Sequence, residues 1–120
     1  MVTVLRGATT IRRNNKLDMQ EAVEELFFKM KEKNNLLINE ISCIIFACTK
    51  DLTCENPATC LRMVEQDISK IPLLCLTHHH YKGALKKCIR IMLMTNQNLD
   101  NPKHVYLNNA KTLREDLKDD

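Results

Sequence analysis

The sequence predicts an α+β fold in which one mixed β-sheet packs against two main helices. Apolar runs of strand length alternate with two stretches of helical periodicity, in the order β-α-β-α-β-β-β. No internal repeat or low-complexity linker interrupts this order. With 120 residues and 44% hydrophobic content, residues 1–120 are expected to form a single domain with a modest core, which oligomerisation would supplement.

The first strand and the first helix follow from residue types and their spacing. Residues 2–10 are rich in β-branched side chains and predict a strand. Asp18 is expected to cap a helix over residues 19–33, with Glu21 three residues later. The apolar residues of this helix recur at helical spacing: Met19, Ala22, Val23, Leu26, Phe27 and Met30. This stripe predicts the helical side of the core.

The middle of the chain predicts two strands separated by a helix. Residues 41–48 are almost continuously apolar, as in a central strand, and residues 71–76 predict another strand that begins near a proline. Asn56 followed by proline is typical of a helix start, here of a helix over 57–64. The free N–H groups of that start form a candidate anion site, and Arg62 lies within two turns of it. A solvated surface charge is the equal alternative for Arg62.

Residues 86–94, Lys-Lys-Cys-Ile-Arg-Ile-Met-Leu-Met, place Arg90 in an almost continuous apolar run. Helical periodicity also fits this run, but the β-branched Ile89 and Ile91 favour a strand that is buried on both faces. A short strand is expected to follow at 104–107. An interior guanidinium costs several kcal/mol unless an anion compensates it. The partner of Arg90 is therefore either a protein carboxylate, the commoner case, or an anionic ligand.

Composition argues against several classes of protein. The longest apolar runs have the length of a strand, so no membrane span is expected, and no secretory signal is visible. We therefore expect a cytoplasmic protein whose six cysteines are reduced and mostly buried. A net charge of +3, scattered basic residues and few aromatic residues argue against binding to nucleic acid.

The histidines at 78–80 suggest a zinc site as an alternative. Cys75 and His78 have Cys-x-x-His spacing, and Cys88 lies on the next predicted strand. Structural zinc sites usually draw their ligands in two closely spaced pairs, and the second pair is missing here. Consecutive histidines more often belong to a solvated loop, so we expect no bound metal.

Three motifs give the chain a resemblance to a known family. Arg-Gly-Ala-Thr-Thr at 6–10, Leu-Lys-Lys-Cys-Ile-Arg at 85–90 and His-Val-Tyr-Leu at 104–107, in that order and separation, resemble the AroH-class monofunctional chorismate mutases. The resemblance implies a homotrimeric pseudo-α/β barrel with an active site in each cleft between subunits. It implies conversion of chorismate to prephenate, a step of phenylalanine and tyrosine biosynthesis. It also makes an anionic ligand the expected partner of Arg90.

The resemblance also implies the residues of the site. Arg90 would stabilise the ether oxygen of the dianionic substrate, while Arg6 and Tyr106 would hold a carboxylate. The other implied substrate-binding residues are Leu74, Cys75, Leu76, Thr77 and His78 on the same subunit, Asn56, Thr59 and Arg62 on the neighbour, and Leu113 and Arg114 in the tail. Cys75 would lie at the ring hydroxyl. No cofactor is implied, because this pericyclic rearrangement needs only a substrate held with its ends together.

The sequence departs from the family pattern at the site. The family has a glutamate, usually credited with stabilising positive charge on the ring, where an ungapped match gives His78, so the resemblance implies Arg90 and His78 as the catalytic residues. Asn56 and Thr59 stand where the family has an aromatic residue and a lysine. Neutral His78 can accept a hydrogen bond, whereas protonated His78 would repel the developing cation. Two functions stay open: a mutase slowed by the missing glutamate, and a trimeric protein that binds small anions without the chemistry.

Overall fold

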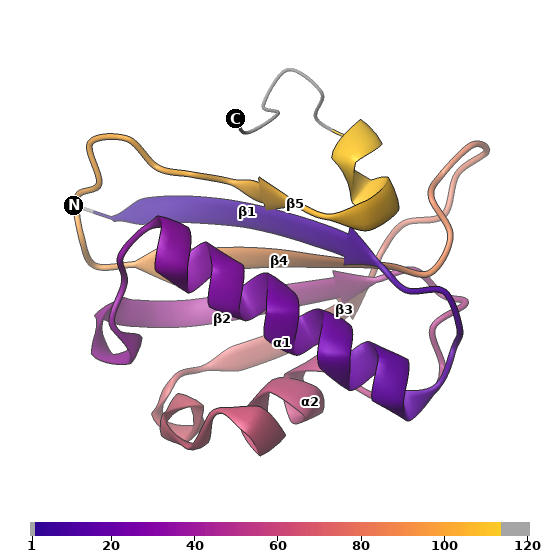
Figure 1. The fold of residues 1–120 in the computed structure, drawn as a ribbon, viewed down its shortest axis with the longest axis horizontal. Coiled ribbons are helices and arrows are strands. Elements are labelled where there is room, and N and C mark those ends of the chain that lie inside the picture. The colour runs from indigo at the N-terminus through magenta and orange to yellow at the C-terminus, as the bar shows by residue number, and fades with distance from the viewer. Residues whose placement is uncertain (1, 114–120) are drawn as a thin grey trace.

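The structure, a computed structural model, describes residues 2–113 and contains one mixed sheet of five strands (Figure 1). The strands are β1 Thr3–Thr10, β2 Ile41–Cys48, β3 Leu73–Thr77, β4 Cys88–Thr95 and β5 Val105–Tyr106. The helices are α1 Lys16–Lys33 and α2 Pro57–Val64, with short 3-10 helices at Ile38–Glu40, Gln66–Lys70 and Asn108–Thr112. The predicted order of strands and α-helices is confirmed.

The strands lie in the spatial order β3-β2-β4-β1-β5, with β4 at the centre. β4 pairs antiparallel with both β1 and β2, whereas the outer strands β3 and β5 pair parallel with β2 and β1. A parallel pair needs a crossover connection, which α2 and the following 3-10 helix supply between β2 and β3. The prediction of a mixed sheet with two helices packed on it is confirmed.

Both helices cover the same face of the sheet, as Figure 1 shows. The side chains of the three inner strands that point to the helices are fully or almost fully buried: Leu5, Ile44, Phe46, Ile89, Ile91 and Leu93. α1 passes so close to β1 that a Cβ added at Gly7 would lie 2.5 Å from Sδ of Met30. Glycine at position 7 therefore permits this close approach. We call this side of the sheet the covered face.

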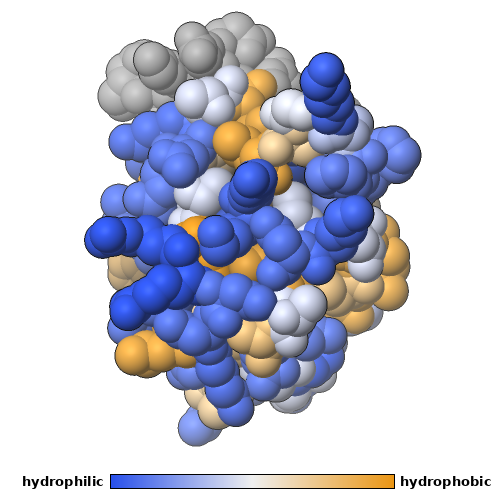
Figure 2. Space-filling view, turned by 90° about the vertical axis from the view of Figure 1, so that its right-hand side faces the viewer, coloured by the Kyte–Doolittle hydropathy of each residue, from blue (hydrophilic) through white to orange (hydrophobic). Residues whose placement is uncertain are grey.

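The opposite side, the open face, carries apolar side chains with no α-helix packed on them. Val4, Leu74, Leu76 and Met92 alternate with the residues of their strands that point to the covered face, and they are 40%, 53%, 49% and 39% exposed. Figure 2 shows apolar surface along its right-hand edge, where the back of the sheet in Figure 1 lies. The prediction that the Arg90 strand is buried on both faces holds only in part for the single chain: on the open face Cys88 is buried against the 3-10 helix Asn108–Thr112, Arg90 is partly buried, and Met92 is exposed.

Several element boundaries differ from prediction, and the starts of α1 and β3 have a clear cause. Asn15, not Asp18, caps α1: its side chain accepts a hydrogen bond from the Asp18 N–H at 2.8 Å, and Asp18 lies in the first turn. β3 begins at Leu73 rather than at 71, because the Ile71 N–H is bonded to the C=O of Ile68 at the end of a 3-10 helix. The predicted cap of α2 is confirmed by a 2.8 Å bond from the Ala58 N–H to the Asn56 side chain. None of the helices within residues 2–113 combines the length and apolar character that crossing a membrane requires.

Candidate active site

One row of paired residues crosses the sheet at Arg90. Arg90 on β4 lies opposite Ala8 on β1 and Ala47 on β2. Tyr106 on β5 and Leu76 on β3 continue the row on the outer strands. Directly paired residues point to the same face, which here is the open face. Because both neighbours of Arg90 are alanines, neither side chain extends past its Cβ into the space around the guanidinium.

Arg6 shares the open face with Arg90. It pairs with Met92, so the two arginines are diagonal neighbours on adjacent strands, roughly 7–8 Å apart by sheet geometry. Neither arginine forms an ion pair with a carboxylate within residues 2–113. The protein carboxylate that could have compensated Arg90 is thus not found in the described chain. Two guanidinium groups on one face form a surface suited to an anion.

Two buried polar atoms lack a hydrogen-bond partner among the residues that the structure describes: Nε of Arg90 and Nδ1 of His78. Leaving a buried donor or acceptor unpaired costs about 1–3 kcal/mol, so folded proteins nearly always satisfy such atoms. Both atoms belong to residues that the sequence predicted as catalytic. The two unpaired atoms therefore lie where the resemblance places the substrate.

His78 follows the last residue of β3, and its N–H donates to the C=O of Cys48 at 2.7 Å. Burial, followed by the positive charge of nearby Arg90, lowers the pKa of His78. A lowered pKa keeps the imidazole neutral at neutral pH. His78 can therefore exchange hydrogen bonds with a ligand, but it cannot supply the negative charge that a glutamate would.

Leu113 packs near Tyr106, the β5 member of the Arg90 row. Together with Leu85, these two residues pack against a small buried cluster of Ala8, Cys88 and Ala110. Leu113 is the last residue that the structure describes, so the predicted substrate-binding residue Arg114 lies outside it. The structure thus brings two of the expected residues, Tyr106 and Leu113, to the cluster around Ala8, which is the β1 partner of Arg90.

A second group of expected residues meets at the carboxyl end of β3. A pocket of about 390 Å³ is lined there by residues that include Asn56, Cys75, Leu76 and Thr77. The side chain of Cys75 packs against the main core, and burial raises the pKa of its thiol. The start of α2 therefore already lies beside β3 of its own chain.

The remaining expected residues are Thr59, Arg62 and Leu74. Thr59 is partly buried in α2, and Arg62 is exposed near the end of this helix. No hydrogen bond or ion pair links either residue to Arg90 within residues 2–113. Leu74 lies on the open face, where it is 53% exposed. One chain alone thus assembles Arg6, Arg90, His78 and Tyr106, and leaves Arg62 without a described partner.

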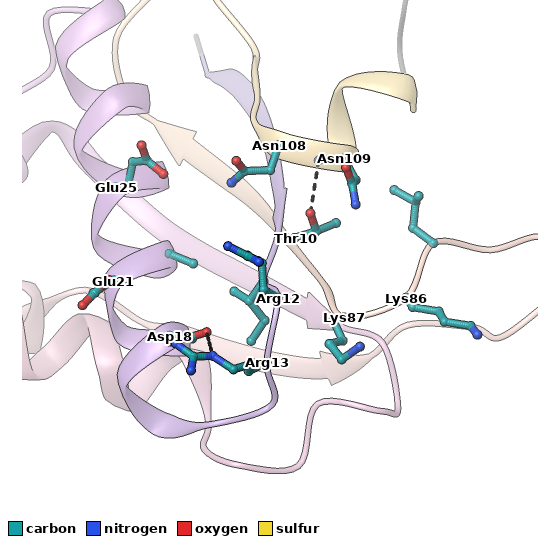
Figure 3. Close-up of a pocket in the computed structure, with 13 residues that line it drawn as sticks. Thr10, Arg12, Arg13, Asp18, Glu21, Glu25, Lys86, Lys87, Asn108 and Asn109 are labelled. Carbon is teal, nitrogen blue, oxygen red and sulfur yellow. Dashed lines mark hydrogen bonds and ion pairs between the residues drawn. The ribbon is translucent and has the colours of Figure 1, made fainter.

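A wider pocket of about 1020 Å³ lies between α1 and the ends of β1 and β4 (Figure 3). Figure 3 shows Asp18, Glu21 and Glu25 on α1 and the basic side chains on the facing segments. The basic residues that line it are Arg12, Arg13, Lys86 and Lys87. Arg13 and Asp18 already form an ion pair at 3.3 Å. None of the residues expected to bind substrate lines this pocket, and its two signs of charge offset each other, so it is a poor site for a dianion.

The zinc alternative finds no ligand set in the described chain. No group of three His, Cys, Asp or Glu side chains within residues 2–113 is placed to hold a metal ion. Cys75 packs with the main core, whereas Cys88 belongs to the small cluster on the open face. The six cysteines are free thiols.

The sequence did not identify three residues that shape the site: Ala8, Ala47 and Leu85. Ala8 lies within the Arg-Gly-Ala motif, and its position two residues after Arg6 places it on the same face of a strand. That spacing was a usable signal for Ala8. Leu85 likewise opens the Leu-Lys-Lys-Cys-Ile-Arg motif, although its closeness to Tyr106 depends on the loop path. Ala47 carried no comparable signal, because its place beside Arg90 depends on strand register.

Known proteins place these features in a family. Residues 2–117 match the family model described as chorismate mutase type I. The chain belongs to this family. It is 34% identical to the chorismate mutase AroH of Thermus thermophilus over 98% of both chains. It is 30% identical to the chorismate mutase AroH of Bacillus subtilis (strain 168), over 98% of this chain and 93% of that protein.

The fold agrees with a solved member of the chorismate mutases. The structure of a chorismate mutase from Clostridium thermocellum matches with a TM-score of 0.86 and 38% sequence identity, covering 92% of this chain and 98% of that one. The expected family and fold are confirmed. Membership of the chorismate mutases assigns isomerase chemistry to the chain, and the alternative of anion binding without turnover is not favoured.

Proposed function

We propose that this single-domain protein converts chorismate to prephenate in a cleft built on the open face, with Arg90 as the catalytic residue. The observation that carries the proposal is the pair of buried, unpartnered atoms, Arg90 Nε and His78 Nδ1. A bound dianion supplies an acceptor for the guanidinium that no carboxylate within residues 2–113 provides. One bound substrate molecule can therefore contact both Arg90 and His78.

Arg90 acts through charge that develops during the reaction. As the carbon–oxygen bond of the substrate breaks, its ether oxygen gains negative charge that it lacked in the ground state. A guanidinium fixed on the central strand needs little reorganisation to stabilise this charge, so it stabilises the transition state more than the substrate. Ala8 and Ala47, the residues paired with Arg90, have no side-chain atoms beyond Cβ that would compete with the substrate for the Arg90 guanidinium.

Arg6 and Tyr106 bind rather than react. Arg6 offers a planar donor fork that matches a carboxylate, and Tyr106 offers a hydroxyl from the neighbouring strand. Holding the carboxylate fixes the dianion in the folded conformation that brings its ends together. The carboxylate keeps its charge throughout, so this contact lowers KM more than it raises kcat.

His78 takes the place of the family's glutamate as a neutral group. With a lowered pKa, its imidazole accepts a hydrogen bond from the ring hydroxyl at neutral pH. It supplies no anion to stabilise the developing carbocation. We expect turnover to be slower than a glutamate at this position would support.

The open face supports a homotrimer. Val4, Leu74, Leu76 and Met92 form an exposed apolar surface of the kind that marks association between proteins. Association of subunits over this face gives Arg62 and the start of α2 a route to the Arg90 cleft of a neighbour. The free thiols support a cytoplasmic location. Prephenate as product implies a place in phenylalanine and tyrosine biosynthesis.

The test of activity is the loss of chorismate ultraviolet absorbance on addition of purified protein. We expect the parent protein and Arg12→Gln to consume chorismate, and Arg90→Gln to be far slower. Arg12 is a matched control because it is an exposed arginine outside the proposed site. Equal losses in both variants, or a parent without turnover, would refute the proposal.

The test of assembly is the mass in solution by light scattering. We expect a trimer for the parent and a smaller species for Met92→Lys, because Met92 lies on the open face. Phe28→Lys is the control, since Phe28 is 55% exposed on α1 and should leave the mass unchanged. A monomeric parent would exclude a cleft shared between subunits.

A further inference from the structure

β5, which carries Tyr106, is the shortest strand of the described sheet, and both of its residues pair with β1. Val105 pairs with Gly7, and Tyr106 pairs with Ala8. One residue earlier on each strand, at Arg6 and His104, a hydrogen bond from backbone to side chain replaces the main-chain pairing. Nδ1 of His104 accepts a hydrogen bond from the backbone N–H of Arg6 at 3.0 Å.

This bond fixes the chemical state of the His104 ring. Nδ1 can accept a hydrogen bond only when it carries no proton, so the neutral imidazole holds its proton on Nε2. A side chain of similar size without an acceptor at this position cannot make the bond. The interaction therefore depends on the atom at the δ position and not only on the volume of the residue.

The bond also joins the two residues that hold the substrate carboxylate. Its donor belongs to Arg6, and its acceptor belongs to the residue two places before Tyr106. After Tyr106 the chain is held to β1 by the bond from the Leu107 N–H to the C=O of Ala8 at 2.9 Å. Before Tyr106, within the described chain, the bond to His104 is the one that reaches Arg6, so its loss lets the start of β5 shift and moves the Tyr106 hydroxyl relative to the Arg6 guanidinium. A misplacement of about 1 Å in a site of this kind costs as much as a hundredfold in rate.

From this geometry, and given the proposed function, we propose that His104 is a positioning residue that keeps Arg6 and Tyr106 in register for the substrate carboxylate. It touches neither the reacting atoms nor the ring of the substrate. Its effect reaches the substrate through the backbone of Arg6 on one strand and through the register of β5 on the other.

The first experiment compares His104→Leu with His104→Asn in the chorismate assay. Leucine removes the acceptor, and we expect KM to rise about tenfold with kcat nearly unchanged, as for the loss of one hydrogen bond that serves binding only. Asparagine places Oδ1 the same number of bonds from the backbone as Nδ1, so it should restore most of the parent KM. Thermal melts confirm that both variants are folded.

The second experiment is a double-mutant cycle with Arg6→Ala. If His104 acts through Arg6, the effect of His104→Leu on KM largely disappears when Arg6 is already truncated. An effect of undiminished size in that background, or an equal rise in KM for the leucine and asparagine variants, would show that the role is only structural and overturn the inference.

The two proposals fail in different ways. An active parent whose KM is unmoved by His104→Leu contradicts the role of His104 and leaves the mutase function standing. A parent without turnover contradicts the mutase function. The same cycle is then measured as the dissociation constant of prephenate by calorimetry, and an affinity unchanged by His104→Leu refutes the positioning role there as well.

Discussion

The two faces of the sheet are built from the same strands but differ in what covers them and in what they carry. The covered face presents buried apolar side chains to α1 and α2, as at Ile91. The open face presents Arg6, Arg90 and partly exposed apolar residues. Because side chains alternate along a strand, consecutive residues such as Ile91 and Met92 belong to different faces. The fold of the subunit and the chemistry of the site can therefore be changed separately.

The contrast also explains how the strand at the centre of the sheet carries a charge. On the covered face a guanidinium would be desolvated by the helices, at a cost of several kcal/mol. On the open face the Arg90 side chain is only partly buried, and no α-helix of the described chain lies over it. The central strand can carry Arg90 because the side chain of this residue points to the open face.

The largest expected effect on the covered face is that of Phe46→Ala. Phe46 is fully buried, so its truncation should lower the free energy of unfolding by about 3–5 kcal/mol in urea titrations. The matched change on the open face is Ile45→Ala. We expect its effect to arise through assembly and to shrink as protein concentration rises. Equal losses that do not depend on concentration would mean that the two faces are not distinct.

Arg90→Lys on the open face should affect turnover and leave stability nearly unchanged. Lysine keeps the charge and loses the planar fork, and removal of one preorganised donor typically lowers kcat by about a hundredfold to a thousandfold, roughly 3–4 kcal/mol. We expect KM and the melting temperature to change little, because the residue lies outside the helix-covered core. Steady-state kinetics and a thermal melt check both points. A large fall in melting temperature would show that Arg90 is structural.

The sequence was sufficient for those parts of the molecule that depend on local chemistry. The Asn56 cap and the apolar stripe of α1 are properties of a few neighbouring residues, and both predictions are confirmed. The cap of α1 was misassigned because Asn15 and Asp18 are equally good capping residues three positions apart. Local preference alone cannot choose between such neighbours.

The site was less predictable because it depends on register. The motif resemblance supplied Arg90, Arg6 and Tyr106, but nothing local to these residues indicates that Arg90 lies opposite two alanines. The hydrogen bond from Arg6 to His104 joins residues 98 positions apart, which no pattern of spacing reveals. Strand order and register are properties of the whole sheet, and they had to come from the structure.

Gly7→Ala tests how closely α1 packs on the covered face. The added Cβ would lie 2.5 Å from Sδ of Met30, which is fully buried and has little room to move. Overpacking of this kind typically costs about 1–3 kcal/mol of stability, to be measured by urea unfolding. Adding Met30→Leu, which shortens the opposing side chain, should recover part of the loss. A stable Gly7→Ala variant would mean that α1 shifts on the sheet without cost.

The smallest expected effect is the titration of His78 on the open face. Burial and the charge of Arg90 lower the pKa of His78, so its protonated form accumulates only below the ordinary value of about 6.5. Protonation places a positive charge beside the developing cation, so kcat/KM should fall with acid through a midpoint below 6.5 and stay level above it.

The lowered pKa of His78 also determines how the stability of the protein changes with pH. Between the lowered pKa of His78 and about 6.5 the unfolded chain binds more protons than the folded chain, so the free energy of unfolding rises with pH across this window and not beyond it. His78→Gln cannot titrate and provides the control. Its kcat/KM profile should lose the acid limb. An acid limb that persists in His78→Gln, or a parent midpoint above 6.5, would assign the titration to another group and leave His78 without the role that its burial beside Arg90 indicates.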